Sequence, residues 1–225
     1  ELAEPLTPEE FADVDSFLYG EGIGGSTEDL AFSPDGQLIM GVEGGLISVS
    51  PGGSIQTVPL SGDPLISPLG IAFDRAGNLW VADAGGPTLR KVSADGIVTT
   101  HLDDSADPPL QSPNDVVVDH RDRVFVSDHC GGAVIGFDPS TGAVFTRHEF
   151  DRVTEGGPNG MAFDEQGTTL YVSTENTGIF CGHDDVPPTG PIAGLFRIDA
   201  SDGRLGERAA VVTDFAQFGD GVTID

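Results

Sequence analysis

The sequence predicts an all-β fold of the propeller class, and two observations carry that prediction. Five segments begin with a small or polar stretch that leads into an apolar run, and they recur at intervals of about 45 residues with a longer gap before the last. Between them, short strand-like runs alternate with polar turns. A strand-built repeat of this length is typical of propeller blades, which surround a common axis. The five segments are residues 26–32, 67–73, 112–118, 157–163 and 219–224.

Each repeat continues with the same order of elements. The apolar strand is followed by a polar turn, a second strand, a third strand and a weaker fourth strand. Asp and Gly in the turns provide side-chain caps and positive φ, while β-branched and aromatic residues dominate the strands. The predicted turns are 33–36, 74–77, 119–122 and 164–167; the second strands are 38–40, 78–81, 124–126 and 170–172; the third strands are 45–49, 88–92, 133–137 and 194–198; the fourth strands are 54–58, 97–101, 144–146 and 209–212.

These elements make four blades and the start of a fifth at Asp220. Residues 7–12 carry a helix-capping pattern, and residues 13–20 are interpreted as a strand that could complete the last blade. We expect residues 1–225 to form one propeller domain that is incomplete at its C-terminus, short of a six-bladed ring by roughly 70–80 residues. We also expect the ring to need further polypeptide, as a second chain or a continuation, because an open blade leaves a strand edge unpaired.

The main functional signal is one position that the segments share when they are aligned on the apolar run that follows. It is the third residue of the first four segments and the second residue of 219–224. It reads Glu28, Leu69, Asn114, Asn159 and Asp220. One repeat position from each blade can face the axis, so four oxygen-bearing side chains would meet there. Carboxylate and amide oxygens suit Ca²⁺ best, with Mg²⁺, Mn²⁺ or Zn²⁺ as substitutes, and the lack of His or Cys argues against a dedicated zinc site. The alternative is that these residues merely cap turns at strand starts.

Such a site would leave positions on the cation open to water and substrate. A cation there can polarise a carbonyl group and lower the pKa of bound water. Asp220 could then take a proton from that water or attack as a nucleophile.

Other polar residues follow the second strands. His129, Glu175 and Glu43 hold corresponding places, where they could contact substrate or simply lie on the surface. Asp83 and Asp128, at the ends of their strands, are interpreted as structural repeat residues. The inserted loop with His183, Asp184 and Asp185 is interpreted as a solvated loop in preference to a second metal site.

The amino-acid composition restricts the classes of binding partner and bears on the cellular compartment. With 10 Lys+Arg against 37 Asp+Glu, the formal charge is −27, which excludes nucleic-acid and anionic-membrane partners. The acidic surface fits adaptation to high salt or a generic acidic protein equally well. No apolar run is long enough to span a bilayer, and a cytoplasmic location is preferred to export. Cys130 and Cys181 follow corresponding strands, so a bridge is geometrically possible; their pairing stays open.

With these motifs the chain resembles the SMP-30/gluconolactonase/regucalcin-like family of six-bladed propellers. The motifs are Ser-Pro-Asn-Asp at 112–115, Gly-Pro-Asn-Gly at 157–160 and Gly-Asp-Gly at 219–221. The resemblance implies a divalent cation in the central channel, held by Glu28, Asn159 and Asp220. It also makes Asn114 the second candidate catalytic residue beside Asp220, on the cation, its bound water or the substrate. The first motif, Glu-Asp-Leu at 28–30, departs from the family's usual Glu-Gly-Pro and is closer to strictosidine-synthase-like relatives.

The resemblance implies a metal-dependent lactonase or esterase that acts on a sugar lactone or a similar small cyclic ester, with His129 and Glu175 as candidate substrate contacts. Two alternatives stay open: a phosphotriester or organophosphate hydrolase on the same scaffold, and a non-catalytic binding propeller stabilised by its metal. A Pictet–Spengler-type synthase is disfavoured because the four oxygen ligands would then have no role.

Overall fold

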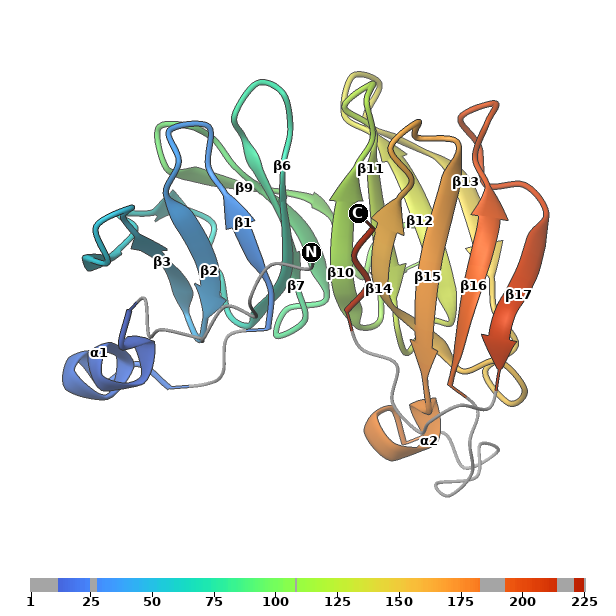
Figure 1. The fold of residues 1–225 in the computed structure, drawn as a ribbon, viewed down its shortest axis with the longest axis horizontal. Coiled ribbons are helices and arrows are strands. Elements are labelled where there is room, and N and C mark those ends of the chain that lie inside the picture. Colours follow the sequence, from blue (N-terminus) through green and yellow to red (C-terminus); the bar gives the residue numbers. More distant parts are fainter. Residues whose placement is uncertain (1–11, 25–27, 108, 183–192, 214–220, 225) are drawn as a thin grey trace, which may run out of the picture.

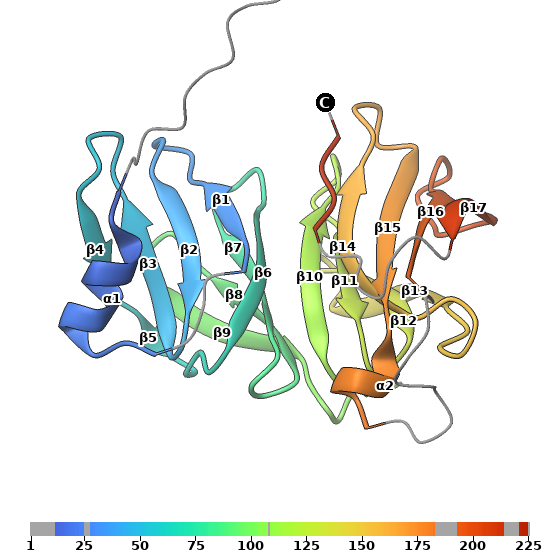
Figure 2. The same cartoon turned by 60° about the horizontal axis from the view of Figure 1, so that its bottom comes forward.

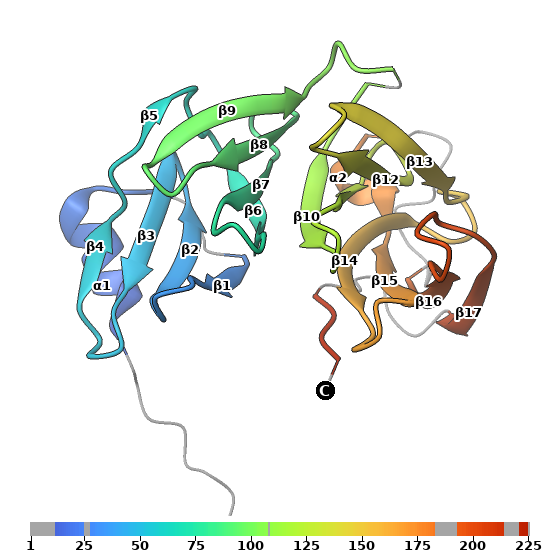
Figure 3. The same ribbon diagram turned by 90° about the horizontal axis from the view of Figure 1, so that it is seen from above.

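The structure, a computed structural model, describes residues 12–224 apart from 25–27, 108, 183–192 and 214–220. Its strands form four sheets, each a blade, which are antiparallel except for one short parallel pair in blade 2 (Figure 1). The blades follow one another around a common centre (Figure 3). The predicted propeller is therefore confirmed, with four blades in the part of the chain that the structure describes.

Each blade uses its strands in sequence order from the centre outward. Blade 1 contains β1 (Leu30–Phe32), β2 (Leu38–Val42), β3 (Gly45–Val49) and β4 (Ile55–Thr57). Blade 2 contains β6 (Pro68–Phe73), β7 (Leu79–Asp83), β8 (Thr88–Val92) and β9 (Ile97–Leu102), with the short β5 (Ser61–Gly62) pairing in parallel with β9. Blade 3 contains β10 (Pro113–Val118), β11 (Val124–Asp128), β12 (Ala133–Asp138) and β13 (Ala143–Glu149). Blade 4 contains β14 (Gly157–Phe163), β15 (Thr169–Glu175), β16 (Gly194–Asp199) and β17 (Arg208–Thr213), with α2 (Thr177–Phe180) between β15 and β16.

The first strands of the blades lie nearest the common centre. Seen from above, β1, β6, β10 and β14 form the inner edge of the arc (Figure 3). The last described segment, residues 221–224, runs beside β14 (Figures 2 and 3). This arrangement brings the start of each repeat, where the candidate ligands are, toward one region.

Apolar side chains fill the spaces between successive blades. One cluster joins blades 2 and 3 through Trp80, Leu89 and Phe137, each at most 1% exposed. A second joins blades 3 and 4 through Phe125 and Leu170. Along each strand, the side chains on one face pack against the neighbouring blade. This packing holds neighbouring blades, and therefore their inner strands, at a set angle to each other.

Residues 13–20 form a helix, so the predicted strand there is wrong. Helix α1 (Val14–Glu21) begins at Asp13, whose carboxylate accepts a hydrogen bond from the backbone N–H of Ser16 at 2.9 Å, and ends at Gly22 with φ 69°. Its Leu18 packs on Val42 and Ile47 of blade 1. Figure 2 shows the helix beside that blade. An N-cap, a buried Leu and a left-handed glycine outweigh the strand-like residues. The capping pattern at 7–12 lies outside the described residues, except for its last residue, Ala12.

Within the described part of the chain, no helix has both the length and the apolar character to cross a membrane.

Asp83 and Asp128 anchor the loops that enter blades 2 and 3, as their repeat position predicted. Asp83 is fully buried and accepts hydrogen bonds from the backbone N–H groups of Ile66 and Ser67 and from Nε of Arg90. Asp128 accepts hydrogen bonds from the N–H groups of the equivalent loop, residues 111–112. Burial raises the pKa of Asp128 above its ordinary value, although these hydrogen bonds act in the opposite direction.

Replacing Asp83 with alanine is expected to destabilise the fold by about 3–5 kcal/mol, because it leaves the buried Arg90 guanidinium without this carboxylate. Urea unfolding measures the change. Asp95→Ala, which removes an exposed turn carboxylate in the same blade, is the control and should change stability by less than about 0.5 kcal/mol. Equal stability losses in the two variants would contradict this role for Asp83.

Candidate metal centre

The candidate ligands in blades 3 and 4 lie in β-bulges of the inner strands. The pairing of β10 with β11 shifts between Pro113 and Val116, and the pairing of β14 with β15 shifts between Pro158 and Met161. Two inner-strand residues therefore oppose one residue of the second strand. The β6–β7 pairing shifts in the same way between Pro68 and Ile71. Because a bulge turns a side chain out of the regular alternation, it can direct that side chain toward the axis.

A cavity of about 400 Å³ lies where these bulges meet. Glu28, Asn114 and Asn159 all line it, so three residues far apart in sequence are brought together. Leu69, from the blade without an oxygen ligand, is not among the lining residues. Asp220 lies outside the described residues, but Gly221, which follows it, lines the same cavity.

Asn159 is held by a side chain from the neighbouring strand of its own blade. It is 4% exposed, and its Nδ2 donates a hydrogen bond to Oε1 of Glu175 at 3.0 Å. The same Oε1 lies 3.6 Å from Nε2 of His129, which follows β11 and is also buried. The structure therefore joins His129 and Glu175 to the candidate ligand Asn159, a link that sequence analysis did not foresee. With its nitrogen bound to Glu175, the amide can present its oxygen as a cation ligand.

Asp29 and Asp115 are two further carboxylates in the cavity lining that sequence analysis missed. Oδ2 of Asp29 accepts a hydrogen bond from the N–H of Ile71 at 2.9 Å, and Oδ2 of Asp115 accepts one from the N–H of Met161 at 2.6 Å. Each bond runs from one blade to the next. Burial raises the pKa of Asp29, although its backbone hydrogen bonds act in the opposite direction.

Glycine occupies the position of these aspartates in the intervening blades. A β-carbon added to Gly70 would lie 2.4 Å from Cα of Asp115, and one added to Gly160 would lie 2.6 Å from Cα of Gly221. The blades therefore approach one another too closely for any side chain at these two positions. The alternation of Asp and Gly after the ligand position was the sequence signal for this close packing.

The donor set fits a divalent cation with hard oxygen ligands. Glu28, Asn114 and Asn159 offer one carboxylate and two amide oxygens, and the cavity lining adds two more carboxylates from Asp29 and Asp115. Carboxylate and carbonyl oxygens are the ligands that Ca²⁺ prefers. Glu43 is exposed and is not part of this lining.

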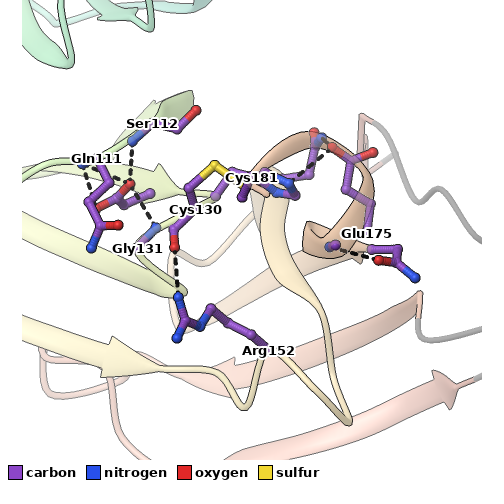
Figure 4. Close-up of a disulfide and its surroundings, with 12 residues drawn as sticks. Gln111, Ser112, Cys130, Gly131, Arg152, Glu175 and Cys181 are labelled. Atoms are coloured by element: carbon purple, nitrogen blue, oxygen red, sulfur yellow. Dashed lines mark hydrogen bonds and ion pairs between the residues drawn. A yellow bond between two sulfur atoms is a disulfide. The ribbon is translucent and has the colours of Figure 1, made fainter. Parts of the chain in front are cut away.

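Cys130 and Cys181 form a disulfide near this site, which settles the pairing that the sequence left open. Their Cα atoms lie 5.4 Å apart, and the bond ties the residue after α2 to the turn that follows β11 (Figure 4). Nη1 of Arg152 donates a hydrogen bond to the carbonyl oxygen of Cys130. His129 lies close to both sulfur atoms, but these are bonded to each other and are therefore not free to bind a metal. His183, Asp184 and Asp185 lie outside the described residues.

Comparison with known proteins agrees with this architecture. The family model described as the SMP-30/gluconolactonase/LRE-like region matches residues 42–225. No curated protein matches the sequence.

Among solved structures, a gluconolactonase from Xanthomonas campestris superposes with a TM-score of 0.68 at 19% identity, covering 88% of this chain and 66% of that one. Regucalcin from Agrobacterium tumefaciens, described as a calcium-binding protein, gives 0.56 at 20% identity, with 77% and 62% covered. Virginiamycin B lyase from Staphylococcus aureus gives 0.61 at 16% identity, with 83% and 55% covered. These identities show a shared fold, and the chain spans just over half to two thirds of the length of these proteins.

Proposed function

Because the chain belongs to the SMP-30/gluconolactonase/LRE-like family, we propose that it is a metal-dependent hydrolase that opens a sugar lactone or a similar small cyclic ester. The observation that carries the proposal is the convergence of Glu28, Asn114 and Asn159 on one cavity. The similarity to a gluconolactonase supports lactone chemistry. The similarity to regucalcin, described as a calcium-binding protein, supports Ca²⁺ as the cation. Zn²⁺, Mn²⁺ and Mg²⁺ are the substitutes to test.

We assign the cation to Glu28, Asn159 and Asp220, with Asn114 on the cation or on the substrate. Bound there, a divalent cation polarises a carbonyl oxygen and makes water a better nucleophile. Asp220 takes a proton from the attacking water as that water adds to the lactone carbonyl carbon. The ring C–O bond then breaks, and the leaving oxygen takes the proton back from Asp220, which gives an open-chain hydroxy acid. Asp220 is alternatively the nucleophile: its carboxylate then adds to the lactone carbonyl carbon, the ring oxygen leaves as a protonated hydroxyl, and water hydrolyses the mixed anhydride to release the hydroxy acid and restore Asp220.

Glu175 and His129 have supporting roles in this proposal. The Glu175 side chain is 12% exposed, so it can accept a hydrogen bond from a substrate hydroxyl while it holds Asn159. Nε2 of His129 lies 3.6 Å from Oε1 of Glu175, close enough for a protonated imidazole to attract that carboxylate.

A hydrolysis panel tests the proposal. The protein is stripped of metal with a chelator, then assayed against sugar lactones and phosphotriesters after addition of Ca²⁺, Mn²⁺, Mg²⁺ or Zn²⁺. Lactone hydrolysis that returns with Ca²⁺ is the expected result. Activity on phosphotriesters alone would favour the alternative hydrolase, and metal binding without hydrolysis of either class would favour a non-catalytic propeller.

Gly160→Ala is expected to weaken Ca²⁺ binding by about 10-fold or more, because the new β-carbon displaces the segment at Gly221 that follows Asp220. Isothermal titration calorimetry measures the affinity. Gly45→Ala is the control, since nothing lies within 4 Å of the added carbon. Unchanged affinity in the Gly160 variant would contradict a role for the 219–221 motif in the site.

The disulfide also bears on the compartment. Disulfides persist in oxidising compartments, so the Cys130–Cys181 bond favours export over the cytoplasmic location preferred from sequence. Alkylation and mass spectrometry of the protein taken from its native cells would show whether the two thiols are free there, and free thiols would contradict export.

A further inference from the structure

Two serine hydroxyls lie inside the bulges that carry the two asparagines. Oγ of Ser127 accepts a hydrogen bond from the N–H of Asp115 at 2.9 Å and donates one to the carbonyl oxygen of the same residue at 3.5 Å. Oγ of Ser173 makes the same pair of bonds with Gly160, at 3.0 and 3.3 Å. Both serines are at most 3% exposed. Each hydroxyl therefore bonds both backbone polar groups of the residue that follows the asparagine.

The serines hold equivalent places in their blades. Each is the single second-strand residue that opposes the two bulge residues, as the pairing of β11 with β10 and of β15 with β14 shows. In blade 2 that residue is Ala82, and the bulge it opposes carries Leu69, which has no oxygen ligand. The hydroxyl is present in both blades that supply an asparagine and absent from the bulged blade that does not.

Blade 2 also shows that the hydroxyl is not needed to form a bulge. The register shift between Pro68 and Ile71 occurs opposite Ala82. The serines in blades 3 and 4 must therefore do something that a bulge carrying Leu69 does not require. What differs is the side chain at the ligand position, where an amide oxygen must have a defined direction and Leu69 need not.

We propose that Ser127 and Ser173 are positioning residues that fix the direction of Asn114 and Asn159 toward the cation. A hydroxyl bonded to both backbone groups of the next residue fixes the peptide unit that follows the asparagine, and with it the asparagine's backbone angle ψ. Side chains that hold metal ligands in place in this way commonly contribute 10–100-fold to metal affinity. This inference rests on the proposed function, because it assigns the serines to the same cation site.

The test compares Ser127→Ala and Ser173→Ala with the unmodified protein by calorimetric titration with Ca²⁺. Blade 2 shows that alanine is compatible with the bulge, so both variants are expected to fold. Each should bind Ca²⁺ about 10–100-fold more weakly. The control is Ser93→Ala, which removes a serine hydroxyl that accepts a backbone N–H in an outer turn of blade 2, and it should bind as the unmodified protein does.

A second readout separates this inference from the proposed function. In ¹⁵N NMR spectra recorded without metal, Ser173→Ala should shift the side-chain amide signals of Asn159, and Ser127→Ala those of Asn114. Ser93→Ala should shift neither. If the unmodified protein binds no Ca²⁺, the proposed function fails, and the NMR signals alone then decide whether the serines position the asparagines. Unshifted amide signals, or unchanged Ca²⁺ affinity in both serine variants, would overturn the inference.

Discussion

Replacing Asn159 with alanine is expected to lower kcat/KM for the proposed lactone hydrolysis by about 10³-fold, the upper end of the loss found when one charge-stabilising group is removed from an active site. Asn159 is expected to show this effect most clearly among the described ligands. It is buried in the cavity lining, and its amide nitrogen is already bonded to Glu175, so its oxygen is directed by the protein. The same variant should weaken Ca²⁺ binding, measured by titration calorimetry, because one of few protein ligands is lost.

Leu69→Ala is the matched control for this prediction. Leu69 occupies the same repeat position in the blade without an oxygen ligand, so its loss should leave Ca²⁺ affinity and kcat/KM close to those of the unmodified protein. If both variants lose activity to the same extent, the effect comes from packing around the axis, and Asn159 is not a metal ligand.

Reduction of the Cys130–Cys181 disulfide is expected to cost about as much stability as the loss of the Asp83 carboxylate. The bond joins residues 51 positions apart, and a closed loop of that length restricts the unfolded chain by about 4 kcal/mol in the chain-entropy description. Urea unfolding with and without a dithiol reductant measures the difference. A Cys130→Ser/Cys181→Ser double variant should have the lower stability from the start and should not respond to reductant. An identical unfolding midpoint for the oxidised and reduced protein would show that the bond does not constrain the unfolded chain.

The repeat was the part of the fold that sequence alone could predict. The position of Asn114 and Asn159 relative to the apolar run that follows defined the blades, and it predicted that these side chains lie together, as the cavity lining shows. The prediction succeeded because each repeat forms one blade, and equivalent positions of the blades face the same central axis.

Contacts between blades were not predictable in the same way. The bonds from Asp29 to Ile71 and from Asp115 to Met161 join residues more than 40 positions apart, and each aspartate alone looks like a turn cap. The link from His129 through Glu175 to Asn159 similarly depends on how the ends of three strands meet.

The prediction of a strand at residues 13–20, where the structure has helix α1, failed for a different reason. Its residues Val14, Phe17 and Tyr19 are acceptable in a strand, and only the cap at Asp13 and the packing of Leu18 on blade 1 select the helix. A tertiary contact decided the structure of a segment with weak local preference.

The most direct test of the central claim locates the metal itself. Crystals of chelated protein soaked in Mn²⁺ are measured by anomalous diffraction, which reports the position of the ion without any assumption about activity. The convergence of Glu28, Asn114 and Asn159 predicts that the strongest anomalous peak lies in their shared cavity, within ligand distance of Asn159. No peak in that cavity, or a stronger one on the acidic surface, would contradict the claim that this repeat position holds a divalent cation.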